Sequence, residues 1–81
     1  VFMKLILGMG LTGLSVARFF SSNNIAYRIA DSRLSPPMHG KCKKENLLSD
    51  CRLGDWKESL LDSVTEIIIS PGIAETEAIV V

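Results

Sequence analysis

The chain has 81 residues, enough for one small domain, because ordinary domains run to roughly 100–200 residues. Hydrophobic residues make up 47% of the chain and charged residues 22%, a composition typical of a folded protein and not of a disordered one. Nine Lys and Arg balance nine Asp and Glu, so there is no basic excess of the kind that binds duplex nucleic acid or an anionic membrane. No apolar run reaches the ~18 residues that a membrane span needs.

The two cysteines and the first apolar stretch both favour a cytoplasmic protein. Cys42 and Cys51 are too few for a disulfide framework and lack the Cys and His partners of a zinc site, so we expect free thiols and no bound metal. Residues 5–14 followed by Ser15-Val16-Ala17 have the outline of a secretory signal and its cleavage site. One positive charge precedes that stretch and three glycines interrupt it, so we interpret it as part of the fold.

The first third of the chain predicts a strand, a helix and a second strand. Residues 2–7 form a short apolar run that stops at a glycine, which is typical of a strand buried on both faces. Apolar residues then recur at helical spacing over residues 11–20, and Ser21-Ser22-Asn23-Asn24 ends that helix. Residues 25–30 return to strand character and stop at Asp31. This is a βαβ unit, whose crossover is almost always right-handed.

The middle of the chain is less regular. Ser35-Pro36-Pro37 excludes a helix there, and residues 38–44 predict a solvated loop. Residues 45–48 predict a helical turn, and Cys51-Arg52-Leu53 predicts a short edge strand.

The last third predicts a helix and a buried strand. Asp55 followed by Glu58 resembles a capping box with Asp in place of Ser or Thr, and it predicts a helix over residues 56–62. The β-branched run over residues 66–69 is typical of a central parallel strand, whereas residues 74–81 are ambiguous. The alternation of strands and helices predicts an α/β fold, a Rossmann-like open parallel sheet with helices on both faces in a single small domain.

One motif carries chemistry. Gly8-Met9-Gly10-Leu11-Thr12-Gly13 has the pattern G-x-G-x-x-G between a predicted strand and a predicted helix, as a dinucleotide-binding turn requires. The first glycine permits the tight turn, the second lets the backbone approach a pyrophosphate, and the third lets the helix pack on the strand. The helix start offers unpaired N–H groups that stabilise a diphosphate, and Thr12 adds a hydroxyl donor. The alternative is a glycine turn that only packs a helix.

Two further segments follow strands that end at the same edge of a parallel sheet. Asp31 ends the second strand, where a carboxylate usually accepts a hydrogen bond from a nucleoside, and Arg33 can stack on a base or pair with a phosphate. Ser70-Pro71-Gly72 follows the isoleucine-rich strand with a stiff turn and a glycine that permits close approach. Each segment alone could be an ordinary turn. Together with the glycine motif they predict a nucleotide site, because ligands of such sheets bind at this edge.

The sequence predicts no catalytic group. His39 has no acidic or thiol neighbour to orient it and is expected in an exposed loop, and Trp56 is expected in the core. No nucleophile–base pair and no paired carboxylates stand in a suggestive frame. A chain of this length is also short for an enzyme with two or three substrates, so we expect a fragment or module whose chemistry, if any, lies elsewhere.

The sequence resembles one family over nearly its whole length. Leu5-Ile6-Leu7-Gly8-Met9-Gly10-Leu11-Thr12-Gly13-Leu14-Ser15 resembles the first strand and loop of the bacterial UDP-N-acetylmuramoyl-L-alanine:D-glutamate ligases, in the Mur ligase family. Asp31-Ser32-Arg33, Ser35-Pro36-Pro37 and Ile69-Ser70-Pro71-Gly72-Ile73-Ala74 follow in that family's order and spacing. The glycine motif is shared with many folds, but its combination with the Ser-Pro-Gly-Ile-Ala turn is much more specific.

The resemblance implies a set of residues that bind UDP and none that is catalytic. They are Gly10, Leu11 and Thr12 at the diphosphate and uridine, Asp31, Ser32 and Arg33 around the uracil, and Ser70, Pro71 and Gly72 on the opposite side of the pocket. Ser32 stands where a threonine is often found in the family, which keeps the hydroxyl and loses a methyl group.

Family members are three-domain enzymes, and residues 1–81 resemble only the first domain, which binds the UDP end of the nucleotide sugar. The ATP-binding loop of the central domain is missing from the sequence, as are the magnesium-binding and D-glutamate-binding segments. The resemblance therefore implies a fragment without a cofactor of its own and without ligase activity, from a cytoplasmic enzyme of peptidoglycan synthesis that uses ATP and Mg. The implied partners are UDP-N-acetylmuramoyl-L-alanine and the remaining domains, with no nucleic acid and no membrane.

Two other functions stay open. A regulatory Rossmann module that binds NAD(P) would use Asp31 to hold the 2′-hydroxyl of an adenosine ribose, and Arg33 would tolerate a 2′-phosphate there. In a protein-interaction domain that binds no nucleotide, the glycines would be purely structural.

Overall fold

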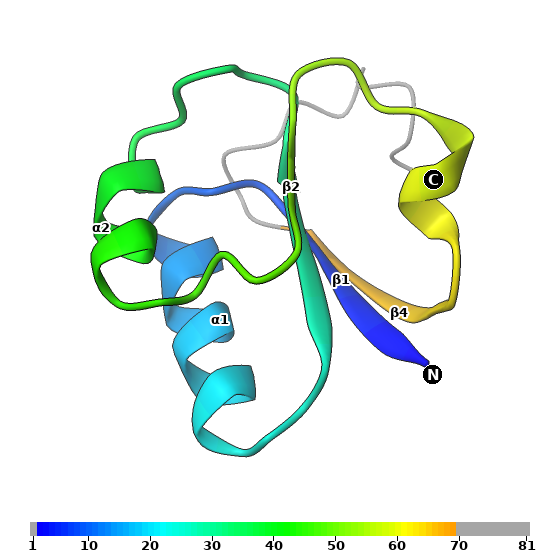
Figure 1. Cartoon of the computed structure of the whole chain (residues 1–81), viewed down its shortest axis with the longest axis horizontal. Helices are drawn as coiled ribbons and strands as arrows, with labels where there is room; N and C mark the ends of the chain where they lie inside the picture. Colours follow the sequence, from blue (N-terminus) through cyan, green and yellow to red (C-terminus); the bar gives the residue numbers. More distant parts are fainter. Residues whose placement is uncertain (1, 70–81) are drawn as a thin grey trace.

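A four-stranded parallel sheet organises the chain (Figure 1). The computed structural model describes residues 2–69. The elements in chain order are β1 (Met3–Leu7), α1 (Leu11–Ser22), β2 (Tyr27–Asp31), α2 (His39–Lys44), β3 (Cys51–Leu53), the 3₁₀ helix η1 (Glu58–Leu61) and β4 (Val64–Ile69). The strand order is β3-β2-β1-β4, which confirms the predicted α/β fold with an open parallel sheet.

Strand β1 lies between β2 and β4 and is buried on both faces. Leu5, Ile6 and Leu7 are all fully buried. Ile6 contributes to the apolar cluster on one face of the sheet, whereas Leu5 and Leu7 belong to the cluster on the other. Burial on both faces explains why the sequence of this strand is a continuous apolar run without alternation.

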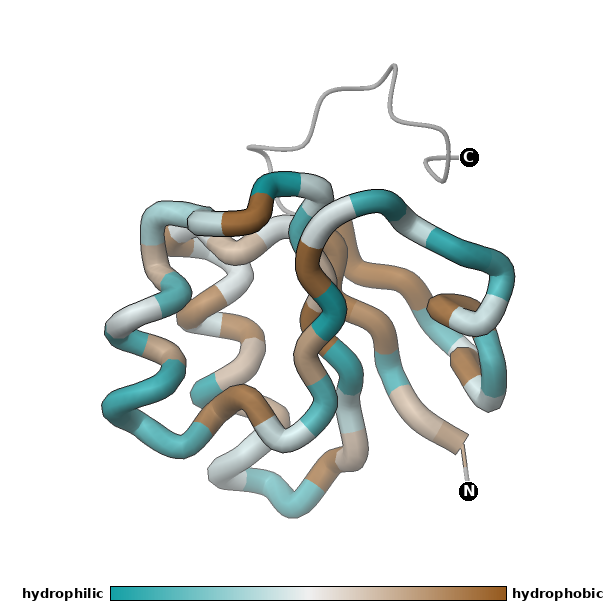
Figure 2. The backbone as a smooth tube through the Cα atoms, turned by 45° about the horizontal axis from the view of Figure 1, so that its top comes forward, coloured by the Kyte–Doolittle hydropathy of each residue, from teal (hydrophilic) through white to brown (hydrophobic). Residues whose placement is uncertain are grey.

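Helices α1 and α2 cover one face of the sheet, and η1 lies on the other (Figure 1). Leu14, Ala17 and Phe20 of α1 and Cys42 of α2 pack into the same cluster as Ile6 of β1. The hydrophobic strands run through the middle of the molecule, and the hydrophilic segments lie mostly at its margins (Figure 2). Helical segments on both faces are therefore confirmed, but the second face is covered by a 3₁₀ helix and its flanking loops.

A buried arginine attaches η1 to the sheet. Arg28 of β2 is only 5% exposed, and its guanidinium donates hydrogen bonds to the carbonyls of Leu60 at 2.6 Å, Asp62 at 3.2 Å and Ser59 at 3.3 Å. The same group pairs with the Asp50 carboxylate at 3.0 Å. One side chain thus binds three carbonyls at the end of η1 and directly after it, and so ties this segment to β2.

The prediction of a solvated loop over residues 38–44 is wrong, because His39–Lys44 forms the helix α2. Cys42 points into the core while the surrounding lysines are exposed. A single buried residue in one and a half turns leaves no periodicity for sequence analysis to detect. The helical turn predicted over residues 45–48 is also displaced, since Glu45 is the C-cap of α2.

The helix predicted over residues 56–62 is reduced to a single 3₁₀ turn, and the predicted capping box is wrong. Lys57 occupies the N-cap of η1, and no side chain caps it. The short edge strand at Cys51–Leu53 is confirmed. The isoleucine-rich strand is also confirmed as β4, but among residues 2–69 it lies at the end of the strand order and not in the centre, and its Ile69 is 42% exposed.

Gly13 provides a direct test of how closely α1 packs on the turn after β1. A Cβ at Gly13 would lie 2.0 Å from the Gly8 carbonyl oxygen, so Gly13→Ala must move backbone. We expect this variant to lose about 3 kcal/mol of unfolding free energy, which outweighs the helix propensity that Ala gains. Urea unfolding measures the loss.

Gly40→Ala is the matched control, because a Cβ on this α2 glycine would meet nothing within 4 Å. It should leave stability unchanged or raise it by up to about 1 kcal/mol. Equal stability of Gly13→Ala and the unmodified protein would contradict the close contact between Gly13 and the Gly8 carbonyl.

Candidate functional site

The glycine motif forms a tight loop between β1 and α1. Gly8 has φ of +107°, a conformation that residues with a side chain rarely adopt. Gly10 is the N-cap of α1 in an extended conformation, and Gly13 packs against the Gly8 carbonyl. The predicted turn at the first glycine and the close packing at the third are confirmed. The role of Gly10 at a pyrophosphate stays a prediction.

The start of α1 is open at its surface. The helix has no side-chain hydrogen bond at its N-cap and no acidic residue in its first turn. Leu11 is 72% exposed, and Thr12 is exposed beside it. Neither the N-cap residue nor the first turn therefore supplies a carboxylate to the first N–H groups and the positive dipole end of the helix, an arrangement that suits an anion.

The Asp31 carboxylate joins the end of β2 to the glycine loop. It is fully buried, and its Oδ2 accepts a hydrogen bond from the Met9 backbone N–H at 2.9 Å. Arg33 donates the other bonds, from its backbone N–H and Nε to Oδ1, each at 2.8 Å, and from Nη2 to Oδ2 at 2.6 Å. The predicted proximity of Asp31 to the glycine loop is confirmed. A nucleoside that bonded to this carboxylate would have to displace a donor of the chain itself.

Asp31 is held in its ionised form. Burial raises the pKa of its carboxyl, but the hydrogen bonds from Arg33 and Met9 together outweigh burial and leave the pKa below its ordinary value. The same pair raises the pKa of Arg33, mainly through the side-chain hydrogen bond to Asp31. The end of β2 therefore carries a neutralised ion pair with one side chain buried and the other partly exposed.

Sequence analysis missed the part that Met9 plays. Its side chain is fully buried, its N–H donates to Asp31, and its carbonyl accepts a hydrogen bond from the Met38 N–H at 3.1 Å. The end of β2 thus binds the Met9 N–H, and the start of α2 binds its carbonyl. The sequence did contain a signal for this contact. Met9 lies between the first two glycines of the motif, and the neighbouring strand β2 ends in the acid Asp31.

The residues that follow Asp31 differ in how far they are exposed to solvent. Ser32 is half-buried and Arg33 is exposed. Leu34, which sequence analysis did not single out, is 77% exposed, and its Cδ2 lies 3.1 Å from where a Cβ on Gly54 would be. This apolar side chain therefore sits at the carboxyl end of β3, on the same edge as the glycine loop.

The third predicted segment, Ser70-Pro71-Gly72, lies outside the described residues. Ile69, the residue before it in sequence, pairs with Leu7, the residue before the glycine motif. The structure therefore brings two of the three predicted segments together at the carboxyl edge of the sheet.

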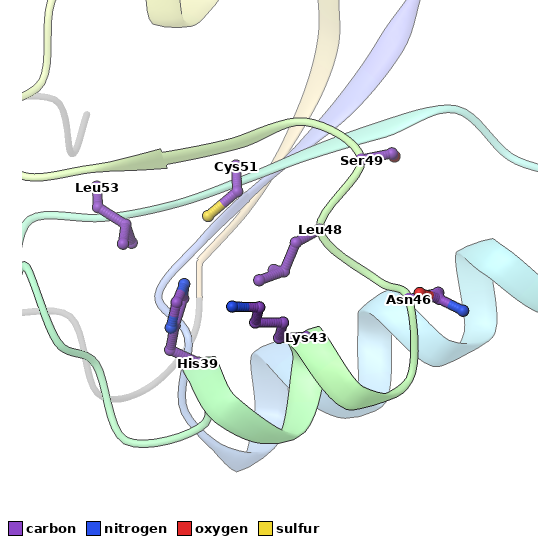
Figure 3. Close-up of a pocket in the computed structure, with 7 residues that line it drawn as sticks. All are labelled: His39, Lys43, Asn46, Leu48, Ser49, Cys51 and Leu53. Atoms are coloured by element: carbon purple, nitrogen blue, oxygen red, sulfur yellow. The ribbon is translucent and has the colours of Figure 1, made fainter.

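A separate hollow lies between α2 and β3 at the side of the sheet (Figure 3). It measures about 780 Å³ and is lined by His39, Lys43, Asn46, Leu48, Ser49, Cys51 and Leu53. None of the predicted site residues within 2–69 lines it. His39 is half-buried on α2, so the prediction of an exposed loop histidine is wrong.

The hollow offers no activated nucleophile. Lys43 and Cys51 point into it, with His39 at one end (Figure 3). Burial raises the pKa of the Cys51 thiol, and it raises that of Cys42 as well, so both stay protonated at neutral pH. Within residues 2–69 no three His, Cys, Asp or Glu side chains gather as metal ligands would, and no helix has the length and hydropathy to cross a membrane.

Comparison with known proteins identifies the family. Residues 3–81 match the family model described as "Mur ligase MurD-like, N-terminal domain". The chain belongs to this family. The resemblance that rests on the glycine motif and on the segments after the second and last strands is thereby confirmed.

Similar proteins in bacteria carry a ligase name. The chain is 38% identical over 74 residues to UDP-N-acetylmuramoylalanine–D-glutamate ligase of Nitrosococcus oceani, a match that covers 91% of the chain and 16% of that enzyme. It is 40% identical over 73 residues to the Marinobacter nauticus enzyme of the same name, covering 90% of the chain and 16% of the enzyme. The Coxiella burnetii enzyme is 35% identical over 78 residues, covering 96% and 18%. This MurD-like domain thus spans about one sixth of its relatives' length.

The lowered pKa of Asp31 predicts an acid-sensitive fold. Its ionised form stabilises the folded state fully above the unfolded pKa of about 3.9, and this contribution is lost as the pH falls through the lower folded pKa. We expect Asp31→Asn to cost about 3 kcal/mol at pH 7, with the difference from the unmodified protein shrinking below about pH 4. Thermal unfolding between neutral and strongly acidic pH measures both.

Glu45→Gln is the control for this profile. Glu45 also has a lowered pKa, mainly from its hydrogen bond to Arg18, but that pair is exposed to solvent and screened. Its substitution should change the pH profile little. A constant difference between Asp31→Asn and the unmodified protein at every pH would contradict the buried ion pair.

Proposed function

We propose that this domain binds the UDP part of UDP-N-acetylmuramoyl-L-alanine, as the first domain of a ligase that adds D-glutamate to a peptidoglycan precursor. The observation that carries the proposal is the uncapped start of α1 behind a rigid G-x-G-x-x-G loop in a MurD-like domain. Helix starts of this kind bind phosphate groups through backbone N–H groups and the helix dipole. The names of the similar proteins, which are ligases for the same substrate pair, support the choice of nucleotide.

The proposed contacts follow the family's order along the carboxyl edge of the sheet. The residues are Gly10, Leu11 and Thr12 for the diphosphate and uridine, Asp31, Ser32 and Arg33 at the uracil, and Ser70, Pro71 and Gly72 on the opposite side. The exposed side chains of Leu11 and Leu34 add apolar surface for the base at this edge. The Arg33 side chain is 47% exposed, so its guanidinium is accessible for stacking on a base.

The domain would contribute binding energy and not chemistry. In the proposed enzyme, ATP with Mg activates the carboxyl of the muramoyl-alanine nucleotide, and the amine of D-glutamate attacks it, both in other domains of a cytoplasmic protein. A nucleotide anchored remotely lets binding energy position the reacting carboxyl. Residues 1–81 alone are therefore expected to bind UDP-sugars weakly and to have no ligase activity.

The engaged Asp31 carboxylate argues against an NAD(P) module. A ribose-binding acid at the end of β2 has to present an open acceptor, and here the chain's own donors occupy it. An interaction domain without a ligand would show no stabilisation by nucleotide, whereas a ligand at 100 times its Kd adds about 2.7 kcal/mol.

Calorimetric titration tests the proposal with two ligands. We expect UDP-N-acetylmuramoyl-L-alanine to bind more tightly than NADH, because an adenosine ribose needs an open acceptor on Asp31 and the similar proteins are ligases named for this nucleotide sugar. Tighter binding of NADH would overturn the proposal. It would also be overturned if neither ligand bound.

Gly10→Ala tests the close approach of the diphosphate. Gly10 has φ of −102° and ψ of −163°, an extended conformation that alanine also adopts, so the substitution introduces no backbone strain. Its methyl group should still lower the affinity for UDP by at least about tenfold, because the backbone can no longer approach the pyrophosphate. Gly40→Ala, on α2, should bind UDP like the unmodified protein.

A further inference from the structure

The outer edge of β3 is open. This strand ends the strand order and pairs with β2 alone among the described residues. The Asp50 carbonyl before it and the Gly54 N–H after it both bond to β2, each at 3.0 Å. Backbone groups alternate along a strand between one edge and the other, so the N–H and carbonyl groups of Cys51 and Leu53 point away from β2. No residue within 2–69 forms a hydrogen bond with them, and an edge of this kind can accept a further strand.

A hollow flanks this edge on each face of the sheet. The hollow between α2 and β3 measures about 780 Å³, and a second one of about 400 Å³ is lined by β3 and by residues of the segment 55–60. Cys51 and Leu53 line both. Figure 1 shows β3 at the front of the sheet, between α2 on one side and η1 on the other, with no described segment in front of it. Because side chains of a strand alternate between the two faces, those of an added strand would enter both hollows.

The hollow beside α2 is basic. Lys43 points into it, and His39 stands at one end (Figure 3). No Asp or Glu lines this hollow, and Lys43 has no ion pair among residues 2–69. Leu48 and Leu53 supply apolar surface beside the ammonium group. A carboxylate on an added strand would therefore give Lys43 the opposite charge that it lacks.

The hollow beside η1 has a different character. Trp56 and Leu60 supply its apolar surface, whereas Asp55 and Lys57 contribute charges of both signs. Arg52 also lines this hollow, but its guanidinium already has a carboxylate partner at 3.1 Å. The charges here are balanced, so this side of the edge favours apolar side chains.

We infer that the β3 edge binds an extended acidic segment of a partner protein, which adds a strand to the sheet with its carboxylates toward Lys43 and its apolar side chains toward Trp56. Strand addition of this kind takes affinity from backbone hydrogen bonds and specificity from alternate side chains. A second copy of this chain is a poorer occupant, because antiparallel pairing of all three β3 residues would place two Arg52 side chains opposite each other. The inference concerns a surface outside the proposed nucleotide site and does not rest on the proposed function.

A peptide of alternating Glu and Val, capped at both ends, is the probe for NMR titration of the whole chain. We expect it to shift the amide signals of Cys51 and Leu53 and to slow their hydrogen exchange, because each amide gains an acceptor. The same peptide with Lys in place of Glu should bind at least about tenfold more weakly. Absence of binding by the acidic peptide would overturn the inference, and so would equal binding of the two peptides.

Methylation of alternate peptide nitrogens separates strand addition from binding through side chains alone. In an added strand only every second N–H faces β3, so a peptide methylated on its Glu nitrogens and one methylated on its Val nitrogens have to differ. We expect one of them to lose at least about tenfold in affinity and the other to lose little. Equal losses would show that the backbone of the peptide does not pair with β3, and the inference would fail.

Lys43→Glu tests the charge that selects the partner, and Lys41→Glu is its matched control. Both lysines are exposed on α2, so neither substitution should disturb the core, but Lys41 lines neither hollow. We expect Lys43→Glu to weaken the acidic peptide by at least about tenfold and Lys41→Glu to change its affinity little. Equal losses would trace binding to overall charge and overturn the inference.

Sedimentation of the unmodified protein tests the second copy as the occupant. We expect a monomer without the peptide, because the two Arg52 side chains disfavour pairing of β3 with itself. A dimer that the acidic peptide dissociates would assign this edge to another copy of the chain, and the inference would fail.

Discussion

The carboxyl edge of the sheet depends on the buried Asp31 carboxylate, whose charge is paired with Arg33 and whose oxygens accept four hydrogen bonds. An ionised carboxylate inside a protein is costly unless opposite charge and hydrogen-bond donors surround it. Asp31 obtains both from its own loop and from Met9. Because the donors come from two segments, the carboxylate can be buried only when the glycine loop and the turn after β2 are both in place. Folding of this edge is therefore cooperative.

The glycine loop is held from three sides, which matters for binding. Asp31 fixes the Met9 N–H, Met38 fixes the Met9 carbonyl, and Gly13 packs directly under the Gly8 carbonyl. A loop that is already ordered loses little conformational entropy when a ligand arrives. At the proposed diphosphate site, little of the binding energy would therefore go into ordering the loop.

Sequence patterns predicted the elements with strong local rules and missed those that depend on single contacts. Gly8 and Gly13 could be assigned because the turn and the close packing exclude other residues at those places. Helix α2 could not, because Cys42 alone faces the core and the lysines around it are typical of a loop. Met9 was a variable position of a motif, and its importance comes from a partner 22 residues away. The pattern therefore located the edge of the sheet but not the contacts that fix it.

Strand β2 carries both buried charges of the described residues, and each organises one part of the fold. Arg28 faces the cluster under η1 and binds carbonyls at the end of that helix, whereas Asp31 at the strand's end binds the loop before α1. Neither could be read as buried from sequence, since charged residues within a strand usually face solvent. Arg28 is matched by three backbone carbonyls and the Asp50 carboxylate, and Asp31 by the Arg33 guanidinium and two backbone N–H groups. A strand with apolar side chains at both positions would bury more easily but would leave these loops unattached. The two charges therefore determine where the irregular segments lie, and the geometry of the candidate site follows from the second of them.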